Sequence, residues 1–331
     1  MKLPWTVGWI SLAAALAAGA APAEAGQAEA VTDRAKREGV ALRLLADHAR
    51  IAPGATLTAG LSLRHDPGYH TYWRSPGIVG LPTAIEWDLP AGVSAGPILW
   101  PGPELSKMGQ ITVWGYERDV VLLTEIKIAP EFAGKTIPLR AKVSWMACAR
   151  RCHPGWIELQ LEVPVGAAKL VPGAGALISA ARKELPVGLP TGWSFEPERN
   201  REEEGDRVSA VLKGPRGFET RDIVFFCDDN QVNSELPQQI KSGPQGLLVM
   251  RFPVSEYAPE KATGLSGVLY HPGGWPGLDS RWLRVEAEYP DADVGGYKGS
   301  RHSCRRGCLL RPGSRQARPL GAAGVGIFLQ E

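Results

Sequence analysis

The feature that most constrains the fold is a succession of short segments in which apolar and polar residues alternate. Examples are residues 40–45, 55–63 and 120–128. Alternation with a period of two directs one face of a β-strand toward a core and the other toward solvent. The 28 prolines and 39 glycines are scattered between the apolar runs. This arrangement is typical of a β-sandwich with many turns and not of a helical bundle.

The pattern predicts two β modules and an all-β fold class. About eight strands are expected before Pro164, as in an immunoglobulin-like β-sandwich, which we assign to residues 38–165. Residues 166–190 interrupt the alternation and contain a helical run that stops at Pro186, so they are predicted to be a linker with one short helix. Alternation returns over residues 191–290 and predicts a second, smaller β-sandwich-like module.

The two ends of the chain differ from these modules. Residues 1–25 combine a basic start at Lys2, an uncharged apolar run over 9–21, and an Ala-Glu-Ala sequence before Gly26. This is the pattern of a cleaved signal peptide, whereas the run is short for a membrane anchor. We therefore expect an exported, periplasmic protein. Residues 291–331 are basic and glycine-rich. They are predicted to be either a disordered tail or the product of a frame shift in GC-rich DNA.

Charge and motifs exclude several classes of function. The chain has 37 basic and 35 acidic residues, a net charge of +2, so neither a nucleic acid nor an anionic membrane is an expected partner. The sequence has no Walker loop, dinucleotide fingerprint, zincin helix or serine nucleophile elbow. Nucleotide-dependent and hydrolytic reactions are therefore not expected, and no cofactor is expected.

The candidate site is a pair of cysteines, Cys148 and Cys152. On a straight strand their α-carbons would lie about 13 Å apart, which is beyond the reach of a disulfide. Across a three-residue hairpin loop or one helical turn the α-carbons lie roughly 5–6 Å apart, which a disulfide can span. Alternating residues on both sides, over 142–145 and 156–163, favour the hairpin. So short a loop gains only about 2 kcal/mol from a disulfide, against about 4.5 for a loop of roughly 80 residues. A bond placed mainly for stability would be expected to span more chain.

Positive charge surrounds this pair, and it is expected to lower the pKa of at least one cysteine by favouring the thiolate. The residues that supply the charge are Arg150, Arg151 and His153. A redox-active pair is one interpretation, and two alternatives stay open. One is a non-catalytic binding module with a structural disulfide. The other is a Cu(I) site, because soft ligands are available within eight residues, namely Cys148, Cys152, Met146 and His153.

Several motifs occur in one order between residues 69 and 155. They are Tyr-His-Thr-Tyr-Trp-Arg-Ser-Pro-Gly at 69–77, Gly-Leu-Pro at 80–82, Ile-Glu-Trp at 85–87, Trp-Pro-Gly-Pro-Glu at 100–104, Trp-Gly-Tyr-Glu at 114–117, Val-Ser-Trp-Met-Ala-Cys at 143–148 and Cys-His-Pro-Gly at 152–155. With its flanks to residue 163, this stretch resembles the periplasmic N-terminal domain of the thiol:disulfide interchange protein DsbD, particularly its suppressor-of-copper-sensitivity relatives. Residues 225–226, 237–238 and 265–269 resemble the region C-terminal to that domain in such relatives, so the likeness runs from about residue 40 to 290.

This resemblance implies a component of a protein-disulfide reductase. Only Cys148 and Cys152 match the family's redox pair, which receives electrons from a membrane domain and passes them to oxidised periplasmic proteins with a thioredoxin fold. By analogy, Cys152 is expected to attack and Cys148 to resolve. The sequence lacks the family's membrane segments and its terminal Cys-x-x-Cys. Electrons are therefore expected from a separate membrane donor, unless the gene is broken.

Aromatic residues near these motifs are candidates for a cover over the cysteines or a docking surface, namely Tyr69, Tyr72, Trp73, Trp114 and Tyr116. The alternative is that they belong to the sandwich core, because alternation directs about half of strand residues inward. His70 is expected to be a surface or packed histidine, and Cys227 a buried lone thiol. Cys304 and Cys308 repeat the spacing of the pair, but no role is expected for them.

Overall fold

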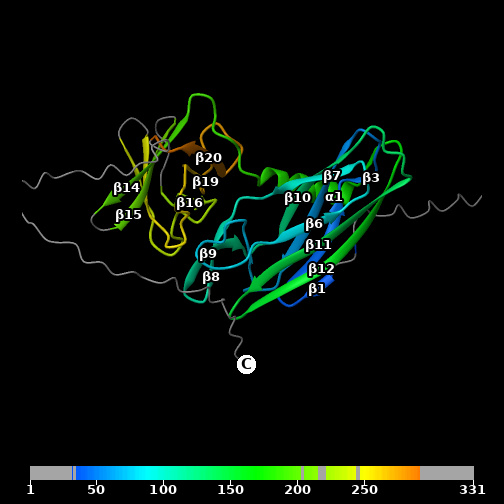
Figure 1. The fold of residues 1–331 in the computed structure, drawn as a ribbon, viewed down its shortest axis with the longest axis horizontal. Coiled ribbons are helices and arrows are strands. Elements are labelled where there is room, and N and C mark those ends of the chain that lie inside the picture. The colour runs from blue at the N-terminus through cyan, green and yellow to red at the C-terminus, as the bar shows by residue number, and fades with distance from the viewer. Residues whose placement is uncertain (1–31, 33–34, 203–204, 215–220, 244–246, 291–331) are drawn as a thin grey trace, which may run out of the picture. The chain divides into compact units, whose positions relative to one another are not determined.

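The computed structural model describes residues 32, 35–202, 205–214, 221–243 and 247–290 (Figure 1). Within these ranges the regular structure is β-strand apart from one helix, α1 (Pro172–Lys183). This helix is too short to cross a bilayer, and no other described segment is a candidate. The predicted signal peptide and the predicted tail, with Cys304 and Cys308, lie outside the described residues.

The first module is a sandwich of two antiparallel sheets. One has the order β1 (Ala35–Arg37), β2 (Val40–Ala46), β4 (Thr56–His65), β10 (Val120–Ile128) and β7 (Val93–Leu99). The other has the order β12 (Cys152–Pro164), β11 (Thr136–Cys148) and β6 (Ala84–Asp88). Leucine and valine side chains of both sheets share one core. A short pair, β13 (Lys169–Leu170) with β3 (His48–Arg50), lies beside them.

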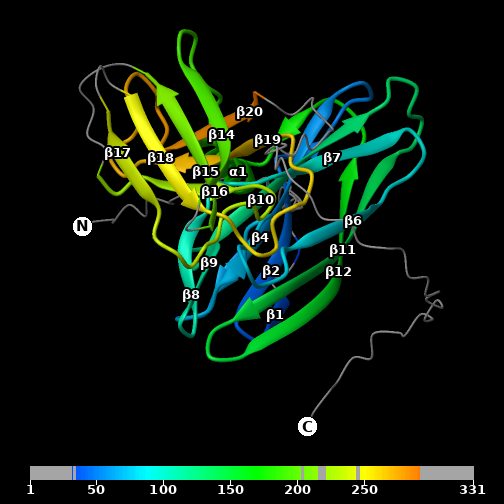
Figure 2. The same ribbon diagram turned by 60° about the vertical axis from the view of Figure 1, so that its left-hand side comes forward.

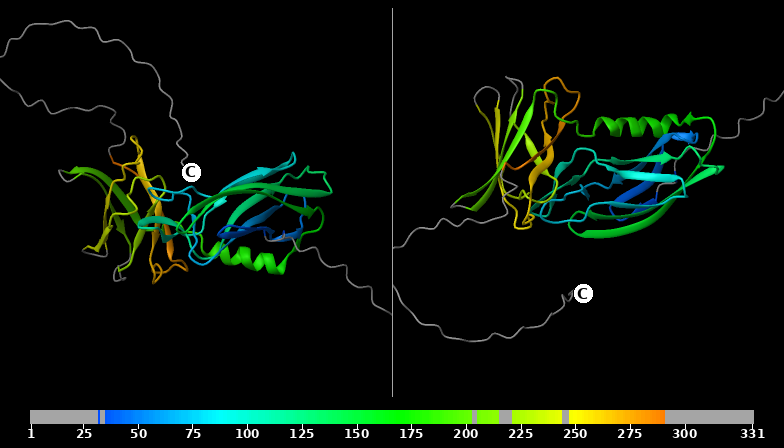
Figure 3. Two further views of the ribbon diagram at one scale, coloured as in Figure 1. Left: turned by 90° about the horizontal axis from the view of Figure 1, so that it is seen from below. Right: turned by 45° about the horizontal axis from the view of Figure 1, so that its top comes forward.

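Helix α1 packs against the larger sheet of this sandwich (Figure 3). Strands β2 and β4 are buried on both faces, so their outer face needs a cover. Three small or branched side chains of the helix are buried, those of Ala174, Ile178 and Ala181. Gly60 in β4 lies below the helix, and a Cβ there would lie 3.4 Å from Ile178 but only 2.8 Å from Val121 of the neighbouring strand β10. The segment between the modules thus adds a layer to the first one.

The second module is another pair of antiparallel sheets (Figure 2). One has the order β14 (Ser194–Glu202), β15 (Gly205–Lys213), β18 (Leu247–Pro253) and β17 (Gln239–Ser242), and the other β16 (Val224–Cys227), β19 (Gly264–Tyr270) and β20 (Trp282–Glu288). Phe225 and Phe252, one from each sheet, stack with ring centroids 4.9 Å apart. The prediction of an all-β fold, with an immunoglobulin-like sandwich followed by a smaller β module, is confirmed.

A third, smaller structure positions the candidate site. It is a three-stranded sheet, which we call the cover sheet, with the order β5 (Thr71–Tyr72), β9 (Ile111–Tyr116) and β8 (Glu104–Met108). The residue before β5, His70, exchanges two backbone hydrogen bonds with Cys148, with N···O distances of 2.9 and 3.0 Å. The cover sheet is therefore joined to the end of β11 that carries the cysteine.

Candidate functional site

The cysteine pair closes the tip of a long β-hairpin. Strands β11 and β12 have 13 residues each and pair without a register shift from Thr136 opposite Pro164 to Cys148 opposite Cys152. The two cysteines form a disulfide, and their α-carbons lie 4.1 Å apart because they are direct cross-strand neighbours. The hairpin predicted from the alternating flanks is confirmed.

The two sulfur-bearing residues differ in their access to solvent. Cys148 is fully buried, whereas Cys152 is exposed. The cause is topological: at this end of the hairpin, β11 lies between β12 and His70, which bridges Cys148, whereas β12 is an edge strand. Cys148 also packs into a small cluster with Tyr72 and Val113. An incoming thiolate can therefore reach Cys152 directly, whereas Cys148 is shielded.

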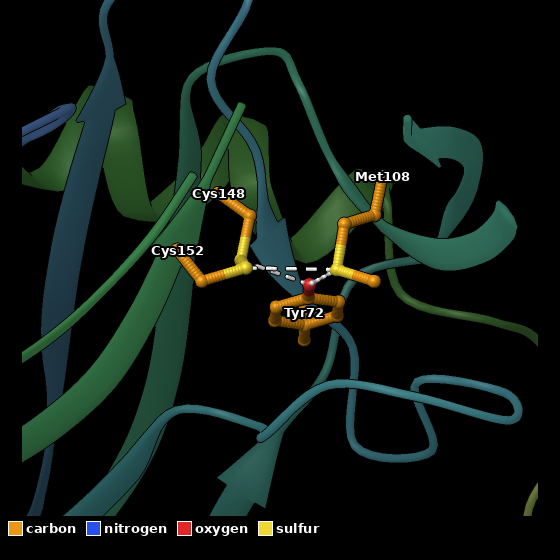
Figure 4. The surroundings of a disulfide bond; sticks show 4 residues. All are labelled: Tyr72, Met108, Cys148 and Cys152. Atoms are coloured by element: carbon orange, nitrogen blue, oxygen red, sulfur yellow. Dashed lines mark hydrogen bonds between the residues drawn. A yellow bond between two sulfur atoms is a disulfide. The ribbon is translucent and has the colours of Figure 1, made fainter. Parts of the chain in front are cut away.

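Two side chains of the cover sheet contact the disulfide (Figure 4). The hydroxyl of Tyr72 donates a hydrogen bond to Cys148 Sγ at 3.0 Å. Tyr72 is fully buried, and this burial raises its pKa to about 12, so the hydroxyl keeps its proton and remains a donor. Met108 Sδ lies 3.5 Å from both the Tyr72 hydroxyl and Cys152 Sγ. One cover-sheet side chain thus contacts each sulfur.

Met108 is the contact that the sequence analysis missed. It ends β8 immediately before the tight turn at Gly109, which has a φ of +63°. The contact joins residues 44 positions apart, so no local pattern indicates it. The one available signal was its place between the Trp-Pro-Gly-Pro-Glu and Trp-Gly-Tyr-Glu motifs.

The other aromatic candidates lie elsewhere. Trp73 and Trp114 are buried against Phe226, with centroid distances of 6.2 and 5.7 Å. Tyr116 is buried and donates to the carbonyl of Pro101 at 2.7 Å. Tyr69 is partly exposed, and its ring centroid lies 6.0 Å from that of His153. Among the five candidates, Tyr72 is the one that the structure brings to the sulfur atoms.

The surface around Cys152 carries basic and aromatic residues, with the acidic Glu38 bordering both of its hollows. Arg150 and Arg151 are exposed in the hairpin loop, and with Tyr69 and His153 they line a hollow of about 590 Å³. A second hollow, of about 390 Å³, includes Cys152 itself. Its other walls include Arg37, Trp145, Pro154 and Trp156. Trp156 shares the outward face of β12 with Cys152 and is 75% exposed.

The structure also places the residues of the alternative Cu(I) site. Cys148 and Cys152 are bonded together, and Met146 packs against the cluster that contains Cys148. The thioether that contacts Cys152 is that of Met108. In the part of the chain that the structure describes, no group of three or more His, Cys, Asp or Glu residues is arranged to hold a metal ion.

Two single residues behave as the sequence predicted. His70 is a packed histidine, 1% exposed, whose ring meets that of Tyr72 edge-on at 5.1 Å. Cys227 is a buried free thiol whose sulfur lies 3.1 Å from a carboxylate oxygen of Asp229. Burial raises the pKa of Cys227 above its usual range, which disfavours the reactive thiolate.

Comparison with known proteins agrees with this geometry. Residues 42–164 match the family described as thiol:disulfide interchange protein DsbD, N-terminal. The solved N-terminal periplasmic domain of ScsB from Proteus mirabilis is similar, with a TM-score of 0.61 and 17% identity over 79% of this chain and 98% of that chain. A conserved domain protein from Bacillus anthracis aligns over 77% of this chain and 87% of that chain at 13% identity, with a TM-score of only 0.24. No curated protein sequence matches the chain. Residues 42–164, which include the disulfide hairpin, are therefore a DsbD/ScsB-like N-terminal domain.

Proposed function

We propose that this protein relays electrons through Cys148 and Cys152 to oxidised periplasmic proteins with a thioredoxin fold. The observation that carries the proposal is the asymmetric disulfide at the hairpin tip, with one exposed and one buried sulfur. Thiol–disulfide exchange needs one accessible sulfur and a second thiol within bonding distance to resolve the mixed disulfide. The pair meets both requirements.

The reaction proceeds in two balanced steps from the reduced pair. The Cys152 thiolate attacks a sulfur of the partner's disulfide, so a mixed disulfide forms and the partner's other sulfur leaves as a thiolate. Cys148 then loses its proton and attacks Cys152 Sγ, which restores the Cys148–Cys152 disulfide and releases the partner's second thiolate. The two partner thiolates take up two protons. Two electrons have moved to the partner, and a separate membrane donor reverses both steps to reduce the pair again.

The basic residues near the pair have a role in this scheme. The pKa of the Cys152 thiol is lowered by Arg150, Arg151 and His153, because positive charge near an exposed sulfur stabilises its thiolate. The partner docks on the face of β12 that carries Cys152 and Trp156. Support comes from the 75% exposure of Trp156, since large exposed aromatic residues commonly anchor protein interfaces.

The organisation of the chain completes the proposal. Residues 1–25 direct export to the periplasm and are cleaved, residues 38–165 form the exchange domain, and 166–190 link it to the second module at 191–290. Residues 291–331 form a basic tail, or arise from a frame shift.

Two single-cysteine variants test the assignment of roles. The background carries alanine at the remaining cysteines, Cys227, Cys304 and Cys308, so that they cannot react. Cys148→Ser keeps the exposed thiol and is expected to trap a mixed disulfide with an oxidised thioredoxin-fold protein. Cys152→Ser keeps the buried thiol and is expected to trap much less. Trapping by Cys152→Ser alone would instead assign the attack to Cys148.

The same proteins separate exchange from a structural disulfide in a non-catalytic binding module. The wild-type pair is expected to equilibrate with glutathione buffers and to exchange with the thioredoxin-fold protein. A pair that resists reduction by glutathione, together with no trapping by either variant, would favour the structural alternative.

Cu(I) binding is a second candidate, favoured by one observation. Met108 brings a thioether to 3.5 Å from Cys152 Sγ, so the reduced site offers two thiolates and a thioether, which suit Cu(I). Anaerobic titration of the reduced protein with Cu(I) tests this. Tight stoichiometric binding that is lost in Cys148→Ser and weakened in Met108→Ala would support the site. Met146→Ala and His153→Ala report whether those residues also act as ligands.

A further inference from the structure

The cover sheet and its flanking segments contact the second module at three places. The contacts come from the segment after β5, from β9 itself, and from the segment that precedes β8. This sheet carries Tyr72 and Met108, the two side chains that contact the disulfide. The contacts are of three kinds: an ion-pair cluster, a hydrogen-bonded serine and an aromatic contact.

The ion-pair cluster centres on Asp228, directly after β16. Its carboxylate pairs with Arg74 and with Arg284, one oxygen to each guanidinium. The Asp228 side chain is only 12% exposed, so these charged hydrogen bonds are largely shielded from water. Arg74 lies two residues after Tyr72. Asp228 thus holds the segment that leads out of β5.

The hydrogen-bonded serine is Ser234. Its hydroxyl donates to the carbonyl of Thr112 in β9 at 2.9 Å and accepts from the amide of Ile78 at 3.3 Å. Gly77 makes room for it, because a Cβ at this position would lie 2.4 Å from Ser234 Oγ, and its φ of +93° suits glycine. Ser234 therefore joins β9 and the segment after β5 to one point of the second module.

The aromatic contact involves two rings of the second module. Phe226 packs edge-on against Trp73 and Trp114, which come from the segment after β5 and from β9. Trp282 donates its indole N–H to the carbonyl of Pro103 at 3.4 Å. A Cβ on the neighbouring Gly102 would lie 2.1 Å from the Trp282 ring. The segment that enters β8 is therefore packed directly on the second module.

A sheet of this size needs such support. Strands β5, β9 and β8 have only two, six and five residues, and so short a sheet is marginally stable without packing against another element. We infer that the second module is a clamp that holds the cover sheet closed over the disulfide, and that Asp228 is its principal positioning residue. By holding Met108 against Cys152 and Tyr72 against Cys148, the clamp slows attack on the disulfide even though Cys152 is exposed.

This inference rests on the exchange function proposed above, but its test needs no protein partner. The measurement is the second-order rate at which dithiothreitol reduces the native disulfide, followed by quenching with an alkylating reagent and mass spectrometry. Asp228→Ala is expected to raise this rate about tenfold, because losing charged hydrogen bonds to one clamp point favours the open cover sheet. Asp228→Glu, which keeps the charge, is expected to restore much of the protection.

Matched variants separate clamping from general stability. Met108→Ala opens the cover directly, so its effect and that of Asp228→Ala are expected to be less than multiplicative when combined. Lys213→Ala removes the Lys213–Glu196 ion pair in the sheet of the second module that does not include β16, and is expected to leave the rate unchanged. Acceleration by Lys213→Ala as large as that by Asp228→Ala would overturn the inference.

Two further measurements keep the inference testable if Asp228→Ala does not fold. Gly77→Ala displaces Ser234 and is expected to accelerate reduction as well. In the wild-type protein, the amide of Trp73, bonded to the Trp114 carbonyl at 3.0 Å, is expected to resist hydrogen exchange as well as the amides of β16 do. Wild-type reduction rates in folded Asp228→Ala or Gly77→Ala, or rapid exchange at Trp73, would refute the clamp.

Discussion

Replacing His70 by phenylalanine should remove much of the protein's sensitivity to acid. The His70 ring is buried against Tyr72, and its Nε2 atom has no hydrogen-bond partner among the described residues. Burial, with a smaller contribution from His65, lowers the pKa of His70 from 6.5 to about 4. The folded protein therefore holds a neutral imidazole at a pH where the unfolded chain binds a proton.

The sign and size of the effect are set by this difference. Between pH 6.5 and pH 4 the unfolded state binds more protons at this site, so stability falls as the pH falls. With folded and unfolded pKa values of about 4 and 6.5, lowering the pH from about 7.5 to about 4.5 removes about 2–3 kcal/mol of unfolding free energy. Phenylalanine keeps the ring and its packing but has no proton to bind.

Urea unfolding of both proteins at these two pH values measures the effect. The wild type is expected to lose about 2–3 kcal/mol more than His70→Phe on acidification. Tyr72→Phe is the control, since it alters the neighbouring ring without removing an imidazole, and it should keep the wild-type pH dependence. Equal losses in the wild type and His70→Phe would show that the buried histidine does not carry the acid sensitivity.

Three other predictions concern the hairpin and the free thiol. Trp156→Ala should change stability by less than about 0.5 kcal/mol in urea unfolding, because the side chain is 75% exposed. The same change should slow thiol–disulfide exchange with a protein partner, and an unchanged exchange rate would exclude a docking role. Gly155→Val should cost about 1–3 kcal/mol in the same assay, because a Cβ there lies 2.5 Å from the Trp145 ring, and a neutral result would contradict this packing. Cys227 should resist alkylation by iodoacetamide in the folded protein and react after unfolding, since burial raises its pKa. Labelling of Cys227 in the folded protein as fast as that of an exposed thiol would contradict this prediction.

Local pattern was sufficient to predict the hairpin. The flanks of the cysteines alternate with a period of two, and an antiparallel ladder propagates in register from a short loop, so Cys148 had to meet Cys152. The buried thiol of Cys227 was likewise predicted from its place at the end of an apolar strand. In each case the information lies within a few residues of the feature itself.

Alternation was insufficient for the aromatic candidates. It indicates which side chains point inward, but not which neighbour they meet. Tyr72 and Trp73 are adjacent and both buried, yet one contacts Cys148 and the other Phe226, which lies in the second module. The packing partner of each side chain depends on which elements lie on either side of β5. The tertiary arrangement of the cover sheet and the second module determines those elements.

The sequence alone determined the β class of this protein, its hairpin and the pairing of Cys148 with Cys152, because these depend on short-range periodicity and register. Only the tertiary structure decided that Cys152 is exposed and Cys148 buried, since this depends on which strand lies at the sheet edge. It also decided that Met108 and Tyr72 contact the disulfide. Those contacts join segments 44 and 76 residues apart, and no local pattern encodes the packing that brings them together.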